Sequence, residues 1–411
     1  MQAKQYYASL ELADDELRLI IGEFYMSRFN PLKVERVKTD GIQKKRIVNQ
    51  TVVAASIVTM LDAVEKSLGF RLKSIILCIP SADVKCIKRR VNVPIEEGSR
   101  RIRTSHARLG IEKAIDSFQI DGYEFVNIGA ITYINGGIAS RSLPVDERSE
   151  TLTMDIDFIC AKQEVVHEFV LCVENAGLRV ADICLDTYAI AEEAAIIEGS
   201  MDKYVVLTNF EKYDTDLALF YKGRFMGCES LGFGYERLAQ VIRRKFRLTE
   251  KEATDLLKES AIFPTYERDD SIIYIYSEKE EYREITRKEI YSAIEEELQH
   301  WIVGVNEANE MIAQTGQARM VLAGSGADIL GMESIKDRFI LDCSVYIPST
   351  IGTRRSCYSA VLGAIYTHKK LQALVHMQSE GVEISTESVR QLQKEDDNAF
   401  TKKLKKILLN K

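Results

Sequence analysis

The sequence predicts a two-lobed α/β fold with a smaller α+β subdomain inserted between the two halves. Each half opens with a pair of apolar strands, at residues 6–12 with 17–24 and at residues 204–207 with 217–221. Residues 81–180, in which short predicted strands and helices alternate, separate the two halves. The 411 residues suffice for roughly two to three domains, and the 46% hydrophobic content suits a large buried core.

The spacing of apolar residues predicts the elements of the first half. Only a short acidic break separates the strands at residues 6–12 and 17–24, which favours a hairpin. Residues 52–68 are expected to be helical, because their apolar positions recur at helical spacing. Residues 74–79 form a continuous apolar run, which is typical of a central strand buried on both faces.

The inserted stretch alternates strands and helices over short distances. A strand at residues 89–95 and a helix at 105–118 precede two or three further strands, the last at 152–160. A helix at residues 163–176 follows and closes on Gly177, a favourable residue for the end of a helix. This pattern predicts a small α+β subdomain.

The second half follows its hairpin with helices. Amphipathic helices are expected at residues 235–246 and 250–259, and one long helix or a broken pair at 287–314. A short buried strand at residues 320–322 leads into Gly324-Ser325-Gly326, and residues 363–377 are expected to be helical. Two hairpin-led α/β halves are the outline of an actin-type fold.

Six segments in this order resemble the FtsA family of bacterial cell-division proteins, and the resemblance covers nearly the whole chain. They are residues 74–81, 94–102, 135–152, 173–182, 215–220 and 321–331. The resemblance implies an actin-like fold in which one outer subdomain is replaced by an insert, of the SHS2-like type, placed elsewhere. The expected domains are the first part of one lobe at 1–80, the insert at 81–180, the second lobe at 181–370 with its outer subdomain near 235–305, a polar linker at 371–397 and a terminal helix at 398–411.

The sequences of the two turns that bind phosphate in this family are altered in this chain. Such turns need glycines, because backbone N–H groups must approach anionic oxygens closely. The first family turn reads roughly Asp-Ile-Gly-Thr-Ser-Lys, and residues 11–16 here place Ala13 at the glycine and Glu16 at the lysine. The second reads Asp-Ile-Gly-Gly-Gly-Thr-Thr-Asp, and residues 209–216 here have no glycine and place Tyr213 where it would crowd a phosphate.

These changes predict the loss of tight ATP binding, which makes the chain a pseudo-ATPase with no catalytic residues and no required cofactor. Carboxylates at Asp14, Asp15 and Glu16 would repel a triphosphate by several kcal/mol at ~5 Å and an effective dielectric near 20. The adenosine-side turn Gly324-Ser325-Gly326 keeps its form, so residual binding of ATP with Mg²⁺ would use it. The family lysine that reaches the adenine side aligns with Leu257, next to Lys258.

Residues 398–411 have the pattern of an amphipathic helix at a membrane surface. Phe400, Leu404, Ile407 and Leu408 fall on one face, and lysines 402, 403, 405, 406 and 411 occupy most of the rest. The expected membrane-binding residues are Phe400, Lys402, Lys403, Leu404, Lys405, Lys406, Ile407 and Leu408. Burial of each apolar anchor gains up to ~1.5–3 kcal/mol, against about 1 kcal/mol or more per ordered residue, so a single copy binds weakly and an oligomer binds well.

Other site classes find little support. The eight cysteines form no C-x-x-C motif and are expected to be reduced core thiols in a cytosolic protein, and the five histidines have no metal-ligand spacing. The acidic turn at residues 14–16 could hold a hard cation, but an ordinary polar hairpin turn is the favoured interpretation, so no metal is expected. The net charge of -7 gives no sign of nucleic-acid binding.

The predicted function is an actin-like cell-division scaffold. No signal-peptide core or membrane span is found, so a cytoplasmic protein, peripheral on the membrane at the septum, is expected. The resemblance implies as partners the FtsZ C-terminal tail, anionic lipids and further copies of the chain in an actin-like polymer. The family arginine implicated in FtsZ contact aligns with Glu297, so no FtsZ-contact residue is named.

A basic cluster at residues 243–247 could dock an acidic peptide, although a solvated helix face is favoured. The alternatives are a slow ATPase of the actin superfamily and an adaptor of another envelope assembly similar to PilM.

Overall fold

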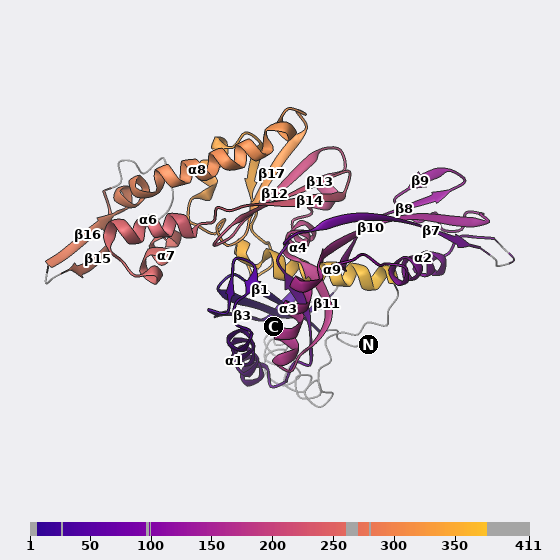
Figure 1. The fold of residues 1–411 in the computed structure, drawn as a ribbon, viewed down its shortest axis with the longest axis horizontal. Coiled ribbons are helices and arrows are strands. Elements are labelled where there is room, and N and C mark those ends of the chain that lie inside the picture. Colours follow the sequence, from indigo (N-terminus) through magenta and orange to yellow (C-terminus); the bar gives the residue numbers. More distant parts are fainter. Residues whose placement is uncertain are drawn as a thin grey trace, which may run out of the picture.

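The structure is a computed structural model that describes residues 6–25, 28–95, 98, 100–259, 270–278 and 281–375. Figure 1 shows an elongated molecule in which one lobe lies below, a second lobe lies above it, and the insert projects to one side. The outer part of the second lobe projects to the opposite side. Two mixed α/β lobes of this kind match the actin-like fold class expected from the sequence.

The first lobe is built on a five-stranded sheet in the order β11-β6-β1-β2-β3. Its strands are β1 (Tyr6–Ala13), β2 (Glu16–Tyr25), β3 (Arg28–Lys38), β6 (Ser74–Ile79) and β11 (Arg179–Leu185). The helices α1 (Gln50–Leu68) and α3 (Gln163–Asn175) contact each other below the sheet in Figure 1, and α9 (Ser359–Val375) packs on β1, β6 and β11 above it. The short strands β4 (Ile42–Gln43) and β5 (Arg46–Ile47) form a hairpin beside this sheet.

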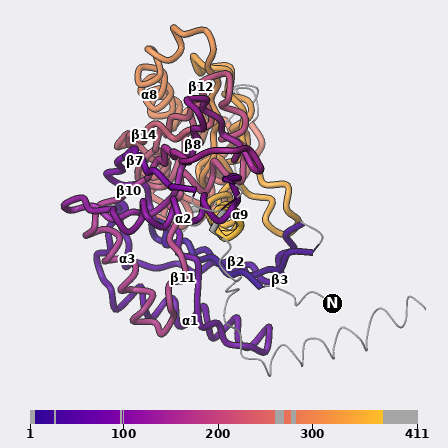
Figure 2. Tube along the Cα trace, turned by 90° about the vertical axis from the view of Figure 1, so that its right-hand side faces the viewer, coloured from indigo at the N-terminus to yellow at the C-terminus, as the bar shows by residue number. Residues whose placement is uncertain are grey.

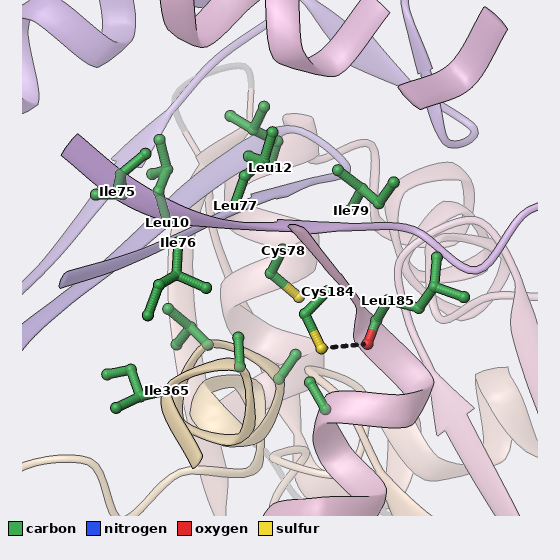
Figure 3. Close-up of a cluster of buried hydrophobic side chains, with 14 of the residues drawn as sticks. Leu10, Leu12, Ile75, Ile76, Leu77, Cys78, Ile79, Cys184, Leu185 and Ile365 are labelled. Atoms are coloured by element: carbon green, nitrogen blue, oxygen red, sulfur yellow. Dashed lines mark hydrogen bonds between the residues drawn. The ribbon is translucent and has the colours of Figure 1, made fainter. Parts of the chain in front are cut away.

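The centre of the first lobe is the strand β6, whose residues are all buried. It lies between β1 and β11 and pairs in parallel with both. Figure 3 shows its Ile and Leu side chains among Leu10, Leu12 and Leu185, with Ile365 of α9 below. The buried thiol of Cys184 donates to the carbonyl oxygen of Leu185 at 3.6 Å. This apolar packing fixes the end of β1, after which the turn at residues 14–15 begins.

The insert has its own sheet and core. Its strands β7 (Lys85–Pro94), β8 (Tyr123–Asn135), β9 (Ile138–Ser140) and β10 (Thr151–Lys162) are ordered β7-β10-β8-β9, and α2 (Thr104–Asp116) packs on β7 and β10. The expected range of 81–180 is too wide, because α3 packs in the core of the first lobe and β11 joins its sheet. Residue spacing cannot reveal which sheet a strand joins, since parallel pairing is made over long sequence distances.

The second lobe carries a sheet ordered β14-β13-β12-β17-β18. The strands are β12 (Tyr204–Phe210), β13 (Thr215–Tyr221), β14 (Arg224–Leu231), β17 (Ala318–Ala323) and β18 (Asp342–Val345). Its outer part holds α6 (Glu236–Phe246), α7 (Glu250–Glu259), the hairpin β15 (Ile272–Glu278) with β16 (Glu281–Thr286), and α8 (Arg287–Ala313). The short helices α4 (Asp186–Glu193) and α5 (Ile196–Gly199) join the lobes, and Figure 2 shows α8 and α1 at opposite ends of the molecule.

The division of the chain between the lobes also differs from the expected boundary at residue 181. The strand β11 continues the sheet of the first lobe to Leu185, and α9 returns to that lobe after the second is complete. The first lobe is therefore assembled from three separate parts of the chain. Among the described residues, no helix combines the length and the apolar character needed to cross a membrane.

Candidate functional site

Four turns meet where the two lobes face each other, and the residues of these turns define the inter-lobe cleft. The first lobe contributes the β1–β2 turn at residues 14–15 and the β4–β5 turn at residues 44–45. The second lobe contributes the β12–β13 turn at residues 211–214 and the turn at residues 324–326, directly after β17. The strands behind three of these turns are largely buried, so apolar packing sets the positions of those turns, whereas in the β4–β5 hairpin only Ile42 is buried.

The local sequence explains why these turns form without the family's glycines. The β1–β2 turn closes on the pair Ala13–Glu16, with Asp15 at a φ of 58°, a left-handed conformation that aspartate tolerates better than most residues. The β12–β13 turn has four residues between Phe210 and Thr215 and is closed by a hydrogen bond from Glu211 N to Asp214 O at 2.9 Å. None of residues 211–214 has a positive φ, so side chains replace glycines there without backbone strain.

Arg18 lies at the centre of the cleft, with its side chain 2% exposed. Its guanidinium donates to Glu16 at 2.6 Å and to Glu11 at 3.3 Å, both in the first lobe. It also donates across the cleft to Glu211 at 3.2 Å and to the carbonyl oxygen of Cys357 at 3.1 Å. The planar guanidinium, with five donors, suits such a set of carboxylates. Arg18 therefore ties three acidic side chains from both lobes together.

Two lysines make further ion pairs between the lobes. Lys45 of the β4–β5 turn contacts Asp214 at 3.0 Å and also pairs with Asp216, whose side chain is fully buried. Lys212 of the β12–β13 turn donates in the other direction to Asp15 at 2.5 Å. It also reaches Glu250 in its own lobe at 3.1 Å. Each lobe therefore supplies cations to carboxylates of the other.

The acidic side chains of the β1–β2 turn are all occupied by groups of this chain. Asp14 accepts from the backbone N–H of Lys45 at 2.9 Å, and Asp15 accepts from Lys212. Glu16 accepts from Arg18 and, at 2.6 Å, from Arg36. The carboxylates that would repel a triphosphate thus already have donors and cations around them.

Burial and pairing with cations shift the pKa values of the acidic side chains in the cleft in opposite directions. Burial raises the pKa of Glu11 to about 8 against the effect of Arg18, and burial raises the pKa of Asp14 to about 6. Burial, helped by the Asp216 charge, raises the pKa of Asp186 to about 7. Burial would also raise the pKa of Glu16, but Arg18 and Arg36 lower it to about 2. Burial and pairing with cations thus act in opposite senses on the pKa values of neighbouring carboxyl groups in the cleft.

The space left at the position of the phosphate turns is small. A cavity of about 20 Å³ is lined by Ala13, Asp14, Lys45, Glu211 and Asp214, among others. That volume is about what one or two water molecules require, and ligand sites for drug-sized molecules measure roughly 300 Å³ or more. A wider, open hollow of about 520 Å³ lies beyond Lys45, lined by Lys44, Arg46 and Asp83 among other residues. Lys45 and Asp214 line both spaces.

The expected adenosine-side turn packs directly on the β12–β13 turn. Ser325 donates its backbone N–H to Glu211 at 2.9 Å, and its hydroxyl donates to the same carboxylate. Gly326 donates its N–H to the carbonyl oxygen of Phe210 at 2.7 Å, and a Cβ at this glycine would lie 2.3 Å from the Phe210 ring. Gly324 has a φ of 90°. The glycines of this turn therefore serve a close approach between two turns of the same lobe.

Several residues of the site were not predicted, and only some left a signal in the sequence. Arg18 interrupts the apolar run of β2, and a buried arginine requires acidic partners, so its role could have been inferred. Lys45 and Glu211 gave no comparable signal, because the partners of their side chains lie more than a hundred residues away. Lys258, rather than the aligned Leu257, faces the cleft, where it donates to the Tyr235 hydroxyl at 3.1 Å, while Leu257 is buried in the core.

The remaining expected sites are not among the cleft residues described above. The residues expected to bind membrane, Phe400 to Leu408, lie outside the described residues, as do residues 376–397 of the expected linker. The basic residues 243–245 are in the last turn of α6, and their side chains are exposed. Within the described part of the chain, no group of three or more His, Cys, Asp or Glu side chains could hold a metal ion.

The comparisons with known proteins agree with this architecture. No family model matches the chain. It is 23% identical over 369 residues to the cell division protein FtsA of Bacillus subtilis, covering 89% of this chain and 84% of the relative. It is also 19% identical to FtsA of Staphylococcus epidermidis over 88% of this chain and 78% of that one.

Solved structures with the same fold include a PilM-PilN type IV pilus biogenesis complex and MreB5 of Spiroplasma citri bound to ADP. The first has a TM-score of 0.56 at 14% identity and covers 88% of this chain and 98% of the other. The second has a TM-score of 0.52 at 12% identity and covers 90% and 98%. The hairpin-led lobes, the inserted subdomain and the similarity over nearly the whole chain to cell division proteins together make this chain an FtsA-like protein with an actin-like fold.

Proposed function

We propose that this FtsA-like protein is a membrane-bound scaffold of cell division that binds no nucleotide tightly and turns over no ATP. The observation that supports this most directly is the content of the inter-lobe cleft. Arg18, Lys45 and Lys212 bond the carboxylates of both phosphate turns, and a cavity of about 20 Å³ remains beside them. A triphosphate would have to displace these ion pairs and leave buried carboxylates without partners, which is costly.

The membrane attachment is proposed for residues 398–411, on the cytoplasmic face of the cell membrane. The apolar stripe of Phe400, Leu404, Ile407 and Leu408, flanked by lysines, suits an anionic lipid surface. Because one copy binds weakly, stable attachment requires self-association of the actin-like body. The partner proposed for the other side of the scaffold is the C-terminal tail of FtsZ, as the resemblance implies.

Flotation of the full chain with liposomes containing anionic lipid tests the membrane and FtsZ parts of the proposal together. We expect the protein to float with the liposomes and to bring FtsZ from the same cell with it. Leu404→Glu should abolish flotation, because it places a charge on the apolar face, whereas Thr401→Ala should leave it unchanged. Flotation that survives Leu404→Glu would contradict the proposed membrane helix, and failure to recruit FtsZ would contradict the partner.

Calorimetric titration with Mg-ATP tests the nucleotide part separately. We expect no binding at micromolar concentrations and no ATP hydrolysis above the rate in buffer. Micromolar binding that is lost on substitution of Gly324 and Gly326 would favour the alternative function, a slow ATPase of the actin superfamily.

An adaptor of another envelope assembly is the second candidate, and the similarity to the PilM structure favours it. In that case, the protein would act without FtsZ. Deletion of residues 398–411 separates the two functions, since the scaffold needs that segment to reach the membrane and the PilM-like adaptor does not. Unchanged lipid binding of the deletion variant would favour the second candidate.

A further inference from the structure

The cleft ion pairs join two lobes that also share apolar packing. One face of the second lobe's sheet, including Val205 and Leu207, packs into the core of the first lobe, whereas the other face has a core of its own. Arg18, Asp15 and Lys45 are held by strands and turns of the first lobe, and Glu211, Lys212, Asp214 and Asp216 by the second. In two-lobed proteins that bind a ligand between the lobes, the ligand supplies the contacts that favour closure. Here the charged side chains of the chain make those contacts themselves.

We propose that the three cross-lobe ion pairs, Arg18–Glu211, Lys45–Asp214/Asp216 and Lys212–Asp15, act as a built-in latch that holds the lobes closed in place of a bound nucleotide. The latch would keep the inter-lobe cleft closed, and this inference rests on the proposed function, in which no nucleotide binds there. It predicts a lobe orientation that is the same with and without Mg-ATP.

The geometry makes Lys45 the residue on which closure depends most. It projects from a two-residue turn of the first lobe and ends between two strands of the second, where it also donates to the Ser230 hydroxyl at 3.2 Å. Its side chain is 12% exposed, and the Asp216 side chain is 0% exposed. Asp216 Oδ2 has no hydrogen-bond partner even with Lys45 in place. Removal of the ammonium group would leave the Asp216 carboxylate buried with no cation beside it, which favours separation of the lobes.

The three pairs differ in exposure, which allows the latch to be tested in parts. Arg18 and Glu211 are 2% and 15% exposed at their side chains, whereas Lys212 and Asp15 are 6% and 28% exposed. The Lys212–Asp15 pair therefore lies nearer the mouth of the cleft. Variants of this outer pair leave the inner charges of Arg18 and Asp216 in place, so they are expected to fold even where inner variants do not.

The first experiment is hydrogen–deuterium exchange of the full chain with Lys45→Met and the matched control Lys44→Met. Both residues lie in the same turn at a positive φ, 48° for Lys44 and 60° for Lys45, so the two variants remove the same charge from the same backbone conformation. We expect Lys45→Met to increase exchange about tenfold or more in the turns at residues 42–47 and 210–215, by opening the cleft locally. Lys44→Met should exchange like the unmodified chain. Equal exchange in the two variants would overturn the latch.

The second experiment uses the outer pair, Lys212–Asp15, and remains informative if Lys45→Met fails to fold. Asp15→Lys and Lys212→Glu each place like charges across the cleft and should increase exchange at residues 210–215. The double variant restores an opposite-charge pair and should return exchange toward that of the unmodified chain. If the double variant exchanges as fast as the two single variants, the pair does not hold the lobes.

The same measurement with Mg-ATP separates this proposal from the proposed function. Unchanged exchange in the unmodified chain supports both. Absence of ATP binding together with equal exchange in Lys45→Met and Lys44→Met would remove the latch and leave the scaffold function standing. Slower exchange at residues 210–215 on addition of Mg-ATP would contradict both, because the nucleotide would then be closing the cleft.

Discussion

Two interfaces join the parts of this molecule, and they are built from different kinds of contact. The inter-lobe cleft buries Arg18 and Asp216 almost completely; Arg18 has partners from both lobes, and Asp216 pairs with Lys45 of the other lobe. The interface between the insert and the second lobe is more exposed. Arg224 of β14 pairs with Asp157 of β10 at 2.6 Å, and Arg141 donates to the carbonyl oxygens of Lys222 and Gly223.

The difference indicates which interface tolerates change. A buried charge that loses its partner retains the full desolvation cost, whereas an exposed charge is rehydrated by solvent. Single substitutions in the cleft should therefore lower the free energy of unfolding strongly. Substitutions at the interface of the insert should lower it weakly and in a salt-dependent way. The predictions below test this contrast, from the largest expected effect to the smallest.

Arg18→Met should have the largest effect on stability. It leaves Glu11, Glu16 and Glu211 without their shared cation, and breaking a buried ion pair in this way costs about 3–5 kcal/mol. Urea denaturation should report this loss in the free energy of unfolding. Arg36→Met is the control, because it removes a more exposed partner of Glu16. Equal losses for the two variants would show that burial does not decide the effect.

Gly326→Ala should destabilise the protein by about 1–3 kcal/mol, as overpacking does. The added methyl group would meet the ring of Phe210, which stacks on Trp301 with ring centroids 4.1 Å apart. Trp301 is the only tryptophan of the chain, so its fluorescence reports the change during unfolding. Gly227→Ala is the matched control, because nothing lies within 4 Å of its added Cβ. A stability of Gly326→Ala equal to that of the control would contradict the close packing of the two turns.

Stability should increase as the pH falls from 8 to 6. The folded-state pKa values of Glu11, at about 8, and Asp186, at about 7, lie above those of the unfolded chain. The folded protein therefore binds more protons in this range, and raising the pH through these values costs stability, on the order of 1 kcal/mol per pH unit. Glu16, with a pKa of about 2, acts in the opposite sense only below about pH 4.5. A urea midpoint that increases from pH 6 to pH 8 would contradict the assigned burial.

Arg224→Met should have the smallest effect, about 1 kcal/mol or less, and should become weaker in 0.5 M salt. The side chains of Arg224 and Asp157 are 29% and 13% exposed, so solvent can replace part of the lost contact. A double-mutant cycle with Asp157→Asn measures the coupling energy of the pair. A coupling as large as the loss in Arg18→Met would remove the contrast between the two interfaces.

Much of the fold could be predicted from apolar periodicity. The helix expected at residues 52–68 is α1 (Gln50–Leu68), the strand at 74–79 is β6, and the long helix at 287–314 is α8 (Arg287–Ala313). The strand β3 was missed because it is an edge strand with Pro31 and many charged residues, and so lacks a continuous apolar pattern. Helix α9 begins at Ser359, before the expected start at 363.

The cleft could be predicted only in part. The loss of glycines from the β12–β13 turn is visible in the sequence, but the cations that occupy the cleft come from three separate places in the chain. Lys45 and Asp216 are brought together by the packing of two lobes, and no local pattern encodes such a contact. The membrane helix, in contrast, is predicted from the local pattern of residues 398–411, and both its structure and its role stay predictions because that segment lies outside the described residues.

The central claim is that this actin-type cleft is filled by the protein's own charged side chains. A crystal structure of the chain grown with Mg²⁺ and a non-hydrolysable ATP analogue tests it most directly. We expect Arg18 to contact Glu211, Lys45 to contact Asp216, and the cleft to contain no nucleotide. Density for a triphosphate between Ala13 and Tyr213, with those two cations displaced from their carboxylates, would contradict the claim.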